Sequence, residues 1–389
     1  MNTSPEAIIP VSKKTWRWLR QGHPAGLGLR YRMTYAWNAF WFDVNWKLQE
    51  GSMDDGDPGL PSDPVFILGL WRSGTSFAHE LLGACPGFVA PSTRQCMNAS
   101  TFALTRRQAG GASAIRPMDG MEISSDSPQE DEFALLALGV PTVYRAFLDP
   151  ARIEELERLL SPDYWLNEAP PEWGGAWLDF LRFVQRQGRP EGHEGRLALK
   201  SPSHSFRVKA IERMFPEGRH LWITRSPDEL LHSNRKMWTA MFKRYGLSAP
   251  RAGLRPARPP WGSSKVAEPH LLESDAAAQR LDGFLLRAFA QAAACLDWMC
   301  AHMGRDRLAV VDFAQLTADP PGVISAAGCR LGLGERLQLR QACEAVASKH
   351  AAYQPERYWK REASVGSDEV LAALAASQCR ALASHGVAN

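Results

Sequence analysis

Short apolar runs followed by helical patterns recur along this chain. The first, residues 65–70 (VFILGL), has strand length and no polar alternation, which is typical of a strand buried on both faces of a parallel sheet. Further strand-like runs lie at residues 196–201 (RLALKS), 219–226 (RHLWITRS) and 307–313 (RLAVVDF), each before a stretch with helical spacing. The pattern predicts an α/β fold of three layers, with a central parallel sheet flanked by helices. Ligands of such sheets bind at the carboxyl ends of the strands.

Segments outside this repeating unit suggest how the chain is divided. Residues 51–64 are rich in Gly, Pro and Asp and predict a linker. We therefore expect an N-terminal helical extension with its linker over residues 1–63, and a single α/β domain over residues 64–389. Residues 246–270 are rich in Pro, Arg and Gly and predict a long loop, either a disordered insertion or a lid over the site.

The bulk composition is that of an ordinary globular enzyme. A net charge of +3 over 389 residues predicts no broad attraction to nucleic acid. The seven cysteines are odd in number and form no CxxC pair, which argues against a disulfide framework or a zinc site. We expect a cytoplasmic protein without a transmembrane segment. The expectation rests on the reduced thiols, on the absence of a signal-peptide pattern and on the absence of an apolar run long enough to span a membrane.

One N-terminal stretch departs from this ordinary composition. Residues 30–48 mix Trp, Tyr and Phe with Arg and Lys. The pattern fits a surface helix that packs its aromatic side chains on the core. It also fits an interfacial helix that lies on a membrane or an apolar substrate channel, giving peripheral membrane contact.

Residues 69–76 (GLWRSGTS) form a Gly-bracketed turn between the first predicted strand and its helix. Backbone N–H groups in such a turn converge on an anion, and the following helix N-terminus adds about half a positive charge. The turn begins at Gly69 and closes at Gly74. Three hydroxyl groups and one cation add donors: Ser73, Thr75, Ser76 and Arg72.

The loop lacks the Lys of a nucleoside-triphosphatase. That Lys reaches the terminal phosphates, and the next Ser or Thr holds magnesium. Here Thr75 stands in the position of the Lys, and Asp312 is the one acidic candidate for magnesium at a strand end. We expect the loop to hold a 5′-phosphate that is not cleaved with a metal, and we expect no metal site.

The segment WRSGTSF, residues 71–77, resembles the 5′-phosphosulfate loop of sulfotransferases that use 3′-phosphoadenosine 5′-phosphosulfate (PAPS), in the bacterial branch with Arg-Ser-Gly-Thr. The segment ITRSPDELLHS places Arg225 at a strand end and Ser233 eight residues later, similar to the family's 3′-phosphate site. An Arg there offers charged donors to the phosphate that distinguishes PAPS. The resemblance covers residues 64–240, with less through residue 320. It implies a P-loop-like fold, PAPS as co-substrate and adenosine 3′,5′-bisphosphate as product.

The segment LALKSPSH resembles the family's Lys-Ser-Pro region and implies that Lys200 stabilises the transferring sulfuryl group. In-line displacement places negative charge on the bridging oxygen of the leaving phosphate, and Lys200 and Arg72 are expected to meet it. Residues 116–135 also look like a segment of large bacterial sulfotransferases. The acceptor is expected to be a small hydroxyl or amine compound, apolar or amphiphilic because the chain is rich in Trp and Phe.

A general base must take the acceptor's proton, and the sequence leaves its identity open. Glu130 and Glu132 are preferred because neighbouring carboxylates raise one another's pKa, which suits a base near neutral pH. The same acidic run also fits the capped start of a helix. His204, four residues after Lys200, is the alternative, and His79 is expected to pack or orient.

Two other functional classes remain open. A P-loop kinase acting on a small molecule would use ATP and magnesium, with another group in place of the missing Lys. A nucleotide-binding protein without catalysis would make Lys200 and the acidic run incidental. The number of subunits is not readable from the sequence.

Overall fold

The computed structural model describes residues 9–22, 29–53, 59–105, 114–115, 122–188, 195–246, 275–350 and 367–387. At its centre lies a five-stranded sheet with strand order β2-β5-β1-β6-β7. The strands are β1 (Val65–Leu68), β2 (Phe88–Val89), β5 (Arg196–Lys200), β6 (Arg219–Thr224) and β7 (Leu308–Asp312). Every neighbouring pair is parallel. The parallel sheet predicted from the apolar runs is confirmed, and the two-residue β2 is an addition.

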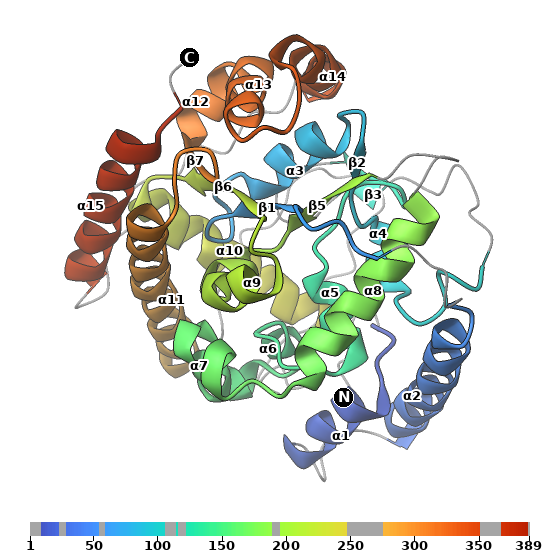
Figure 1. Ribbon diagram of the computed structural model, residues 1–389. Helices are drawn as coiled ribbons and strands as arrows, with labels where there is room; N and C mark the ends of the chain where they lie inside the picture. Colours follow the sequence, from blue (N-terminus) through green and yellow to red (C-terminus); the bar gives the residue numbers. More distant parts are fainter. Residues whose placement is uncertain are drawn as a thin grey trace, which may run out of the picture.

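Both faces of the sheet are buried, because alternate residues of each strand enter different cores. In β1, Phe66 and Leu68 belong to one apolar cluster, while Val65 and Ile67 belong to a second. Helices α3 (Thr75–Gly83), α13 (Pro320–Arg330) and α14 (Arg336–Lys349) cover the second cluster. Helices α8 (Glu172–Gly188), α9 (Val208–Met214), α10 (Pro227–Tyr245) and α11 (Asp275–His302) cover the first (Figure 1). This is the predicted three-layer arrangement.

The register of the sheet brings distant segments of the sequence to one edge. Ile67 near the end of β1 lies beside Lys200, the last residue of β5, and Thr224 of β6 lies beside Asp312 of β7. Since parallel strands end at the same edge, the loops after β1, β5, β6 and β7 share one side of the molecule. Helix α12 (Phe313–Ala318) starts at this edge directly after β7.

The N-terminal helices α1 (Lys13–Gly22) and α2 (Leu29–Glu50) pack on the same core as the sheet. The amide of Ser12 donates to the carbonyl of Ala137, at 2.7 Å, and the Thr15 hydroxyl donates to the carbonyl of Leu136, at 2.8 Å. Both carbonyls belong to α5 (Glu132–Leu138). The division at residue 63 stays a prediction.

The remaining elements complete the described chain. They are α4 (Thr93–Met97), the antiparallel pair β3 (Ala114–Ile115) and β4 (Glu122–Ile123), α6 (Arg145–Leu148), the 3₁₀ helices η1 (Pro150–Leu160) and η2 (Pro202–Phe206), α7 (Pro162–Asn167) and α15 (Ser367–His385). The loop predicted at residues 246–270 lies outside the described residues from 247 onward. Residues 54–58 of the linker and residues 116–121 of the segment 116–135 also lie outside them. All seven cysteines are free thiols.

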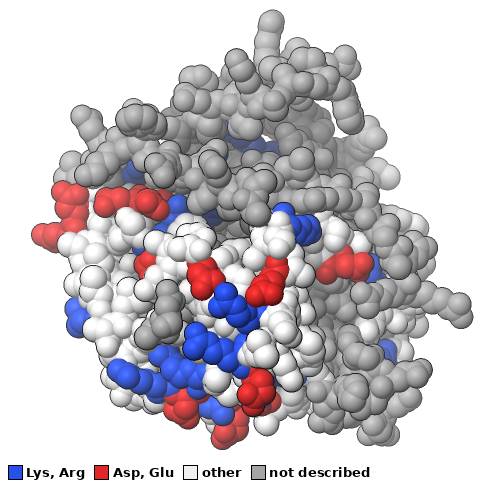
Figure 2. Space-filling model, turned by 90° about the horizontal axis from the view of Figure 1, so that it is seen from above, with Lys and Arg blue, Asp and Glu red and all other residues white. Residues whose placement is uncertain are grey.

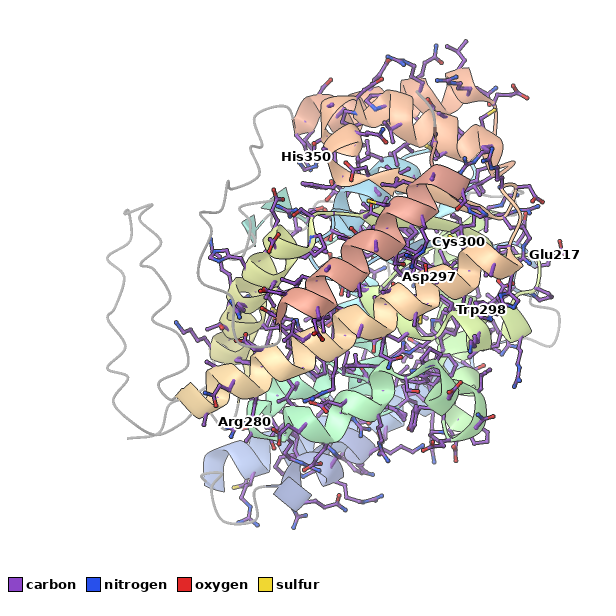
Figure 3. All side chains as sticks on the ribbon, turned by 90° about the vertical axis from the view of Figure 1, so that its left-hand side faces the viewer. Glu217, Arg280, Asp297, Trp298, Cys300 and His350 are labelled. Carbon is purple, nitrogen blue, oxygen red and sulfur yellow. The ribbon has the colours of Figure 1, made fainter. Side chains whose placement is uncertain are left out.

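Helix α11 has the length and composition of a membrane span over Ala276–His302, and within the described chain it is the one helix that has both. Half of its apolar window is buried inside the protein. Figure 3 shows α15 lying along it, with Asp297 of α11 at the contact. Asp297 accepts hydrogen bonds from Ser377 at 3.0 Å and from Arg380 at 2.7 Å. The side chains of Leu285, Phe289 and Leu296 of α11 are fully buried, as in a core helix of a globular fold.

The surface charge is mixed where it can be seen. In Figure 2, basic and acidic side chains lie side by side on the described part of the face, without a large area of one sign. Oppositely charged side chains also pair within the structure, as Arg307 and Glu212 do at 2.8 Å.

Candidate active site

The Gly-bracketed turn connects the end of β1 to the start of α3 and requires both of its glycines. Gly69 has φ +139° and Gly74 has φ +98°, values that disfavour side chains. A Cβ on Gly69 would lie 2.6 Å from the carbonyl oxygen of Ile223, and one on Gly74 would lie 2.5 Å from the ring of Phe313. Gly74 is the N-cap of α3, so Thr75 begins the helix and its N-terminus faces the turn. The local geometry is that of an anion-binding loop.

Not every hydroxyl of the loop is directed outward. Ser73 is fully buried, and its hydroxyl donates to the carbonyl of Leu70 at 2.8 Å. Its amide donates to the same carbonyl at 3.2 Å. Ser73 therefore closes the turn, while the Ser76 hydroxyl on the first turn of α3 is partly exposed.

The two halves of the predicted nucleotide site come together although they are far apart in sequence. Nε of Arg72 donates to the hydroxyl of Ser233 at 3.0 Å, and Nη1 of Arg225 donates to the carbonyl of Arg72 at 2.8 Å. The Arg225 guanidinium also lies 4.5 Å from the centre of the Phe313 ring. Arg72 itself has φ +70°, a conformation that costs a non-glycine residue about 1–2 kcal/mol. Arg225, directly after β6, and Ser233 of α10 thus hold a cation with a strained backbone at the loop.

Lys200 lies between the loop and the acidic run. Its Nζ donates to the hydroxyl of Ser76 at 3.1 Å and to Oε1 of Glu130 at 2.6 Å. The Lys200 side chain is 2% exposed and that of Glu130 is 14% exposed. A cation at the end of β5, a hydroxyl of the phosphate loop and a carboxylate therefore form one contiguous group.

The three neighbouring acids of the predicted base segment have three different environments. Asp131 accepts hydrogen bonds from His204 at 2.9 Å and from Trp177 at 2.7 Å. Both oxygens of Glu132 are bound by Arg207, at 2.6 and 2.7 Å, with both side chains fully buried. The acids are thus not one solvated run, because each is held by a different partner.

Burial raises the pKa of Asp131, but the charge and the hydrogen bond of His204 act against it. Together with the Trp177 hydrogen bond they lower the pKa of Asp131, so this carboxyl is ionised at neutral pH. His204 is itself fully buried, and its Nε2 faces Asp131. This pair ties η2 to the start of α5.

Sequence reasoning missed Tyr144, which contacts the same group. Its hydroxyl donates to Oε2 of Glu130 and accepts a hydrogen bond from Nε1 of Trp71 at 3.2 Å. Burial and the nearby Glu130 carboxylate raise the pKa of Tyr144 well above its usual value, so the phenol stays protonated. Tyr144 lies just before α6 in a stretch with no motif, and only the packing of α6 against the loop reveals it.

His79 and Asp312 have structural contacts in this region. Nε2 of His79 lies 3.0 Å from the carbonyl of Ala198. Burial and the nearby Lys200 ammonium lower the pKa of His79 to about 3, so the ring is neutral. Asp312, the one candidate for magnesium, caps α12 by accepting from the amide of Ala314 at 2.8 Å.

Comparisons with known proteins give the family and the fold. Residues 64–257 match a family model described as the sulfotransferase family. Omega-hydroxy-beta-dihydromenaquinone-9 sulfotransferase Stf3 is 32% identical over 196 residues in both Mycobacterium bovis and Mycobacterium tuberculosis, which is 49% of this chain and 49% of each relative. The matched part thus spans about half the length of the curated relatives.

Two solved structures share the fold at low sequence identity. Sulfotransferase STF9 from Mycobacterium avium aligns over 98% of both chains with a TM-score of 0.57 and 15% identity. Sulfotransferase STF1 from Mycobacterium tuberculosis H37Rv aligns over 93% of this chain and 90% of that chain, with a TM-score of 0.54 and 16% identity. The family match spans the loop, Lys200 and Arg225, and with the shared fold it shows that the chain belongs to the sulfotransferase family.

Proposed function

We propose that this chain transfers a sulfuryl group from PAPS to a hydroxyl group of a small, lipid-like acceptor. The observation that carries the proposal is the position of Lys200, whose Nζ joins the phosphate loop at Ser76 to the Glu130 carboxylate. Membership of the family implies a sulfuryl donor, and the contact between Arg72, Arg225 and Ser233 supports one with an additional 3′-phosphate.

The donor would be held at two ends. The backbone N–H groups of the loop, the N-terminus of α3 and the side chains of Arg72, Thr75 and Ser76 would bind the 5′-phosphosulfate. Arg225 and Ser233 would bind the 3′-phosphate by charge-assisted hydrogen bonds. Ser73 would hold the turn closed, since its amide and hydroxyl both donate to Leu70.

Glu130 is the general base of this proposal. It is the acid beside Lys200 that retains exposure, and Tyr144 and Lys200 each hold one of its oxygens. Glu132 and His204 are fully buried in pairs with Arg207 and Asp131, which keeps them from an acceptor. We therefore prefer Glu130 to the other two candidates.

The chemical step is an in-line displacement at sulfur. A bond forms from the acceptor oxygen to sulfur, and the bond from sulfur to the bridging oxygen breaks. Adenosine 3′,5′-bisphosphate leaves, and the acceptor proton passes to Glu130. Lys200 and Arg72 would stabilise the charge that develops on the bridging oxygen, and fixed donors of this kind contribute about 10²- to 10³-fold each.

The acceptor is proposed from the named relative, which acts on an omega-hydroxy dihydromenaquinone. A hydroxylated isoprenoid or another long-chain alcohol would agree with the many Trp and Phe residues of this chain. A cytoplasmic location is part of the same proposal, because free thiols are typical of a reducing compartment.

Nucleotide binding and turnover test the proposal separately. At about 100 times its Kd, adenosine 3′,5′-bisphosphate adds about 2.7 kcal/mol to the stability of the folded protein. With about 2 cal/mol/K of unfolding entropy per residue, this raises Tm by roughly 3 °C for a chain of this length, without magnesium. Stabilisation by ADP with magnesium, but not by the bisphosphate, would favour the kinase alternative.

Turnover should be measured with sulfur-labelled PAPS and a panel of long-chain primary alcohols. Glu130→Gln keeps the shape of the side chain and removes the base, so kcat should fall by about 10²- to 10⁴-fold. The matched variant Asp126→Asn changes an exposed acid of the preceding turn and should retain wild-type kcat. If Glu130→Gln also retains it, the base lies elsewhere; binding without turnover on any acceptor would favour the non-catalytic alternative.

A further inference from the structure

Helix α2 has two apolar faces on opposite sides. One face, which includes Tyr35, Ala39 and Phe42, is buried in the core and explains why the helix packs on the domain. A helix that is apolar on all sides is ordinarily enclosed by protein or lipid. Helix α2 instead lies at the periphery of the fold, below the sheet in the view of Figure 1.

The opposite side of α2 carries the largest apolar side chains that reach solvent. Among the described residues, seven large apolar side chains are exposed, and five of them lie on this helix. They are Met33 (65% exposed), Trp37 (64%), Phe40 (44%), Trp41 (43%) and Leu48 (57%). Spacings of three, four and seven residues place them on one face of a helix, which we call the aromatic face.

The aromatic face is a packed surface rather than a set of scattered side chains. The rings of Trp37 and Trp41 meet edge to face with centroids 5.7 Å apart, and those of Phe40 and Trp41 meet with centroids 5.4 Å apart. Single exposed apolar residues are ordinary, but a contiguous apolar patch marks a binding surface.

Two basic side chains lie beside this face. Nζ of Lys13 lies 4.9 Å from the centre of the Phe40 ring, and Lys47 is seven residues after Phe40, on the same side of α2. Lys14 and Arg17 of α1 are also exposed. Residues 13–50 hold seven basic and two acidic residues, a net charge of +5, whereas the whole chain has +3. The N-terminal segment that carries the aromatic face is therefore net positive, while the rest of the chain has a net charge of −2.

We propose that the aromatic face of α2 docks on the surface of an anionic phospholipid bilayer. Trp side chains favour the boundary between headgroups and acyl chains, because the ring is apolar and its N–H can bond to the polar layer. Basic residues beside them are attracted by anionic headgroups. An amphipathic surface with both features lies in the plane of the interface without crossing it.

A second copy of the chain fits this surface less well. A two-fold interface places the same patch on both sides, so it would bring one region of net charge +5 against another. A bilayer with anionic lipids supplies the opposite charge. One consequence rests on the proposed function: docking would bring the enzyme to an acceptor that is dissolved in the membrane.

Vesicle flotation without nucleotide or acceptor tests the docking, so its result does not depend on sulfuryl transfer. Vesicles of phosphatidylcholine alone are compared with vesicles of phosphatidylcholine and phosphatidylglycerol in equal parts. Wild-type protein should float with the anionic vesicles. The variant with Trp37→Ser, Phe40→Ser and Trp41→Ser should bind at least about tenfold more weakly, because it loses three apolar anchors.

Three further variants separate the contributions. Leu337→Ser removes an apolar side chain of α14 that is 67% exposed and should float as the wild type does. Lys14→Glu and Arg17→Glu should each weaken binding to anionic vesicles by about fivefold or more, and added salt should reduce the difference. Unchanged Tm values show that the variants are folded.

Any of three results would overturn the proposal. The first is a wild-type protein that does not float with the anionic vesicles, and the second is a triple variant that floats as well as the wild type. The third is a dimer that light scattering detects for the wild type but not for the triple variant, which would assign the aromatic face to a second copy.

Discussion

Replacing Arg225 by Ala tests whether the two halves of the nucleotide site bind opposite ends of one ligand. Charge-assisted hydrogen bonds to a phosphate contribute about 1.5–3 kcal/mol, which corresponds to about 10- to 150-fold in Kd. Arg225→Ala should therefore weaken the binding of adenosine 3′,5′-bisphosphate more than the binding of adenosine 5′-monophosphate, which lacks the 3′-phosphate. The difference should be this factor.

The structure gives Arg225 a second role that must be separated from the first. Its Nη1 donates a charge-assisted hydrogen bond to the carbonyl of Arg72, and loss of such a bond costs about 1.5–3 kcal/mol for either nucleotide. Asn234 is the matched control, since its Nδ2 holds the neighbouring carbonyl of Trp71, also at 2.8 Å, and carries no charge. Asn234→Ala should weaken the binding of both nucleotides by similar factors.

Isothermal titration calorimetry of the two nucleotides against wild type, Arg225→Ala and Asn234→Ala supplies the six dissociation constants. The decisive quantity is the ratio of the two affinity losses in each variant. A ratio near one for Arg225→Ala would refute the assignment of the 3′-phosphate site, because Arg225 would then act only through the loop. A large ratio for Asn234→Ala would show that the loop itself discriminates.

Three further predictions concern buried titratable groups. Lys200→Met should lower kcat by about 10²- to 10³-fold while nucleotide affinity in calorimetry stays within about threefold, and an unchanged kcat would remove Lys200 from the chemical step. Arg207→Met leaves Glu132 buried without its partner and should cost about 3–5 kcal/mol, a fall in Tm of roughly 4–6 °C by scanning calorimetry; adding Glu132→Leu should restore most of it, and no recovery would contradict the pairing. The lowered pKa of His79 predicts that the unfolded state binds its proton first, so stability is full above pH 6.5 and falls by about 2 kcal/mol on acidification to pH 5 in urea titrations. His79→Asn should lessen that fall, the exposed His302→Asn should leave it unchanged, and equal slopes in both variants would contradict the argument.

The sequence by itself determined the parallel sheet and the phosphate loop. Both depend on neighbours in the chain: the apolar runs of β1, β5, β6 and β7 predict buried strands, and the spacing of Gly69 and Gly74 predicts a turn that only glycine can form. The sequence did not predict strand β2, because two residues are too few to form a periodic pattern.

Tertiary structure decided which acid can act at the site. Glu130, Asp131 and Glu132 are neighbours in the sequence, and their spacing gives no indication that one meets Lys200, one His204 and one Arg207, each about 70 residues away. The packing of η2 against the start of α5 selects these partners, since burying each charge requires a counter-charge at hydrogen-bonding distance. The exposed aromatic face was likewise undecided by composition, because only the packed helix shows which of its aromatic side chains the core leaves in water.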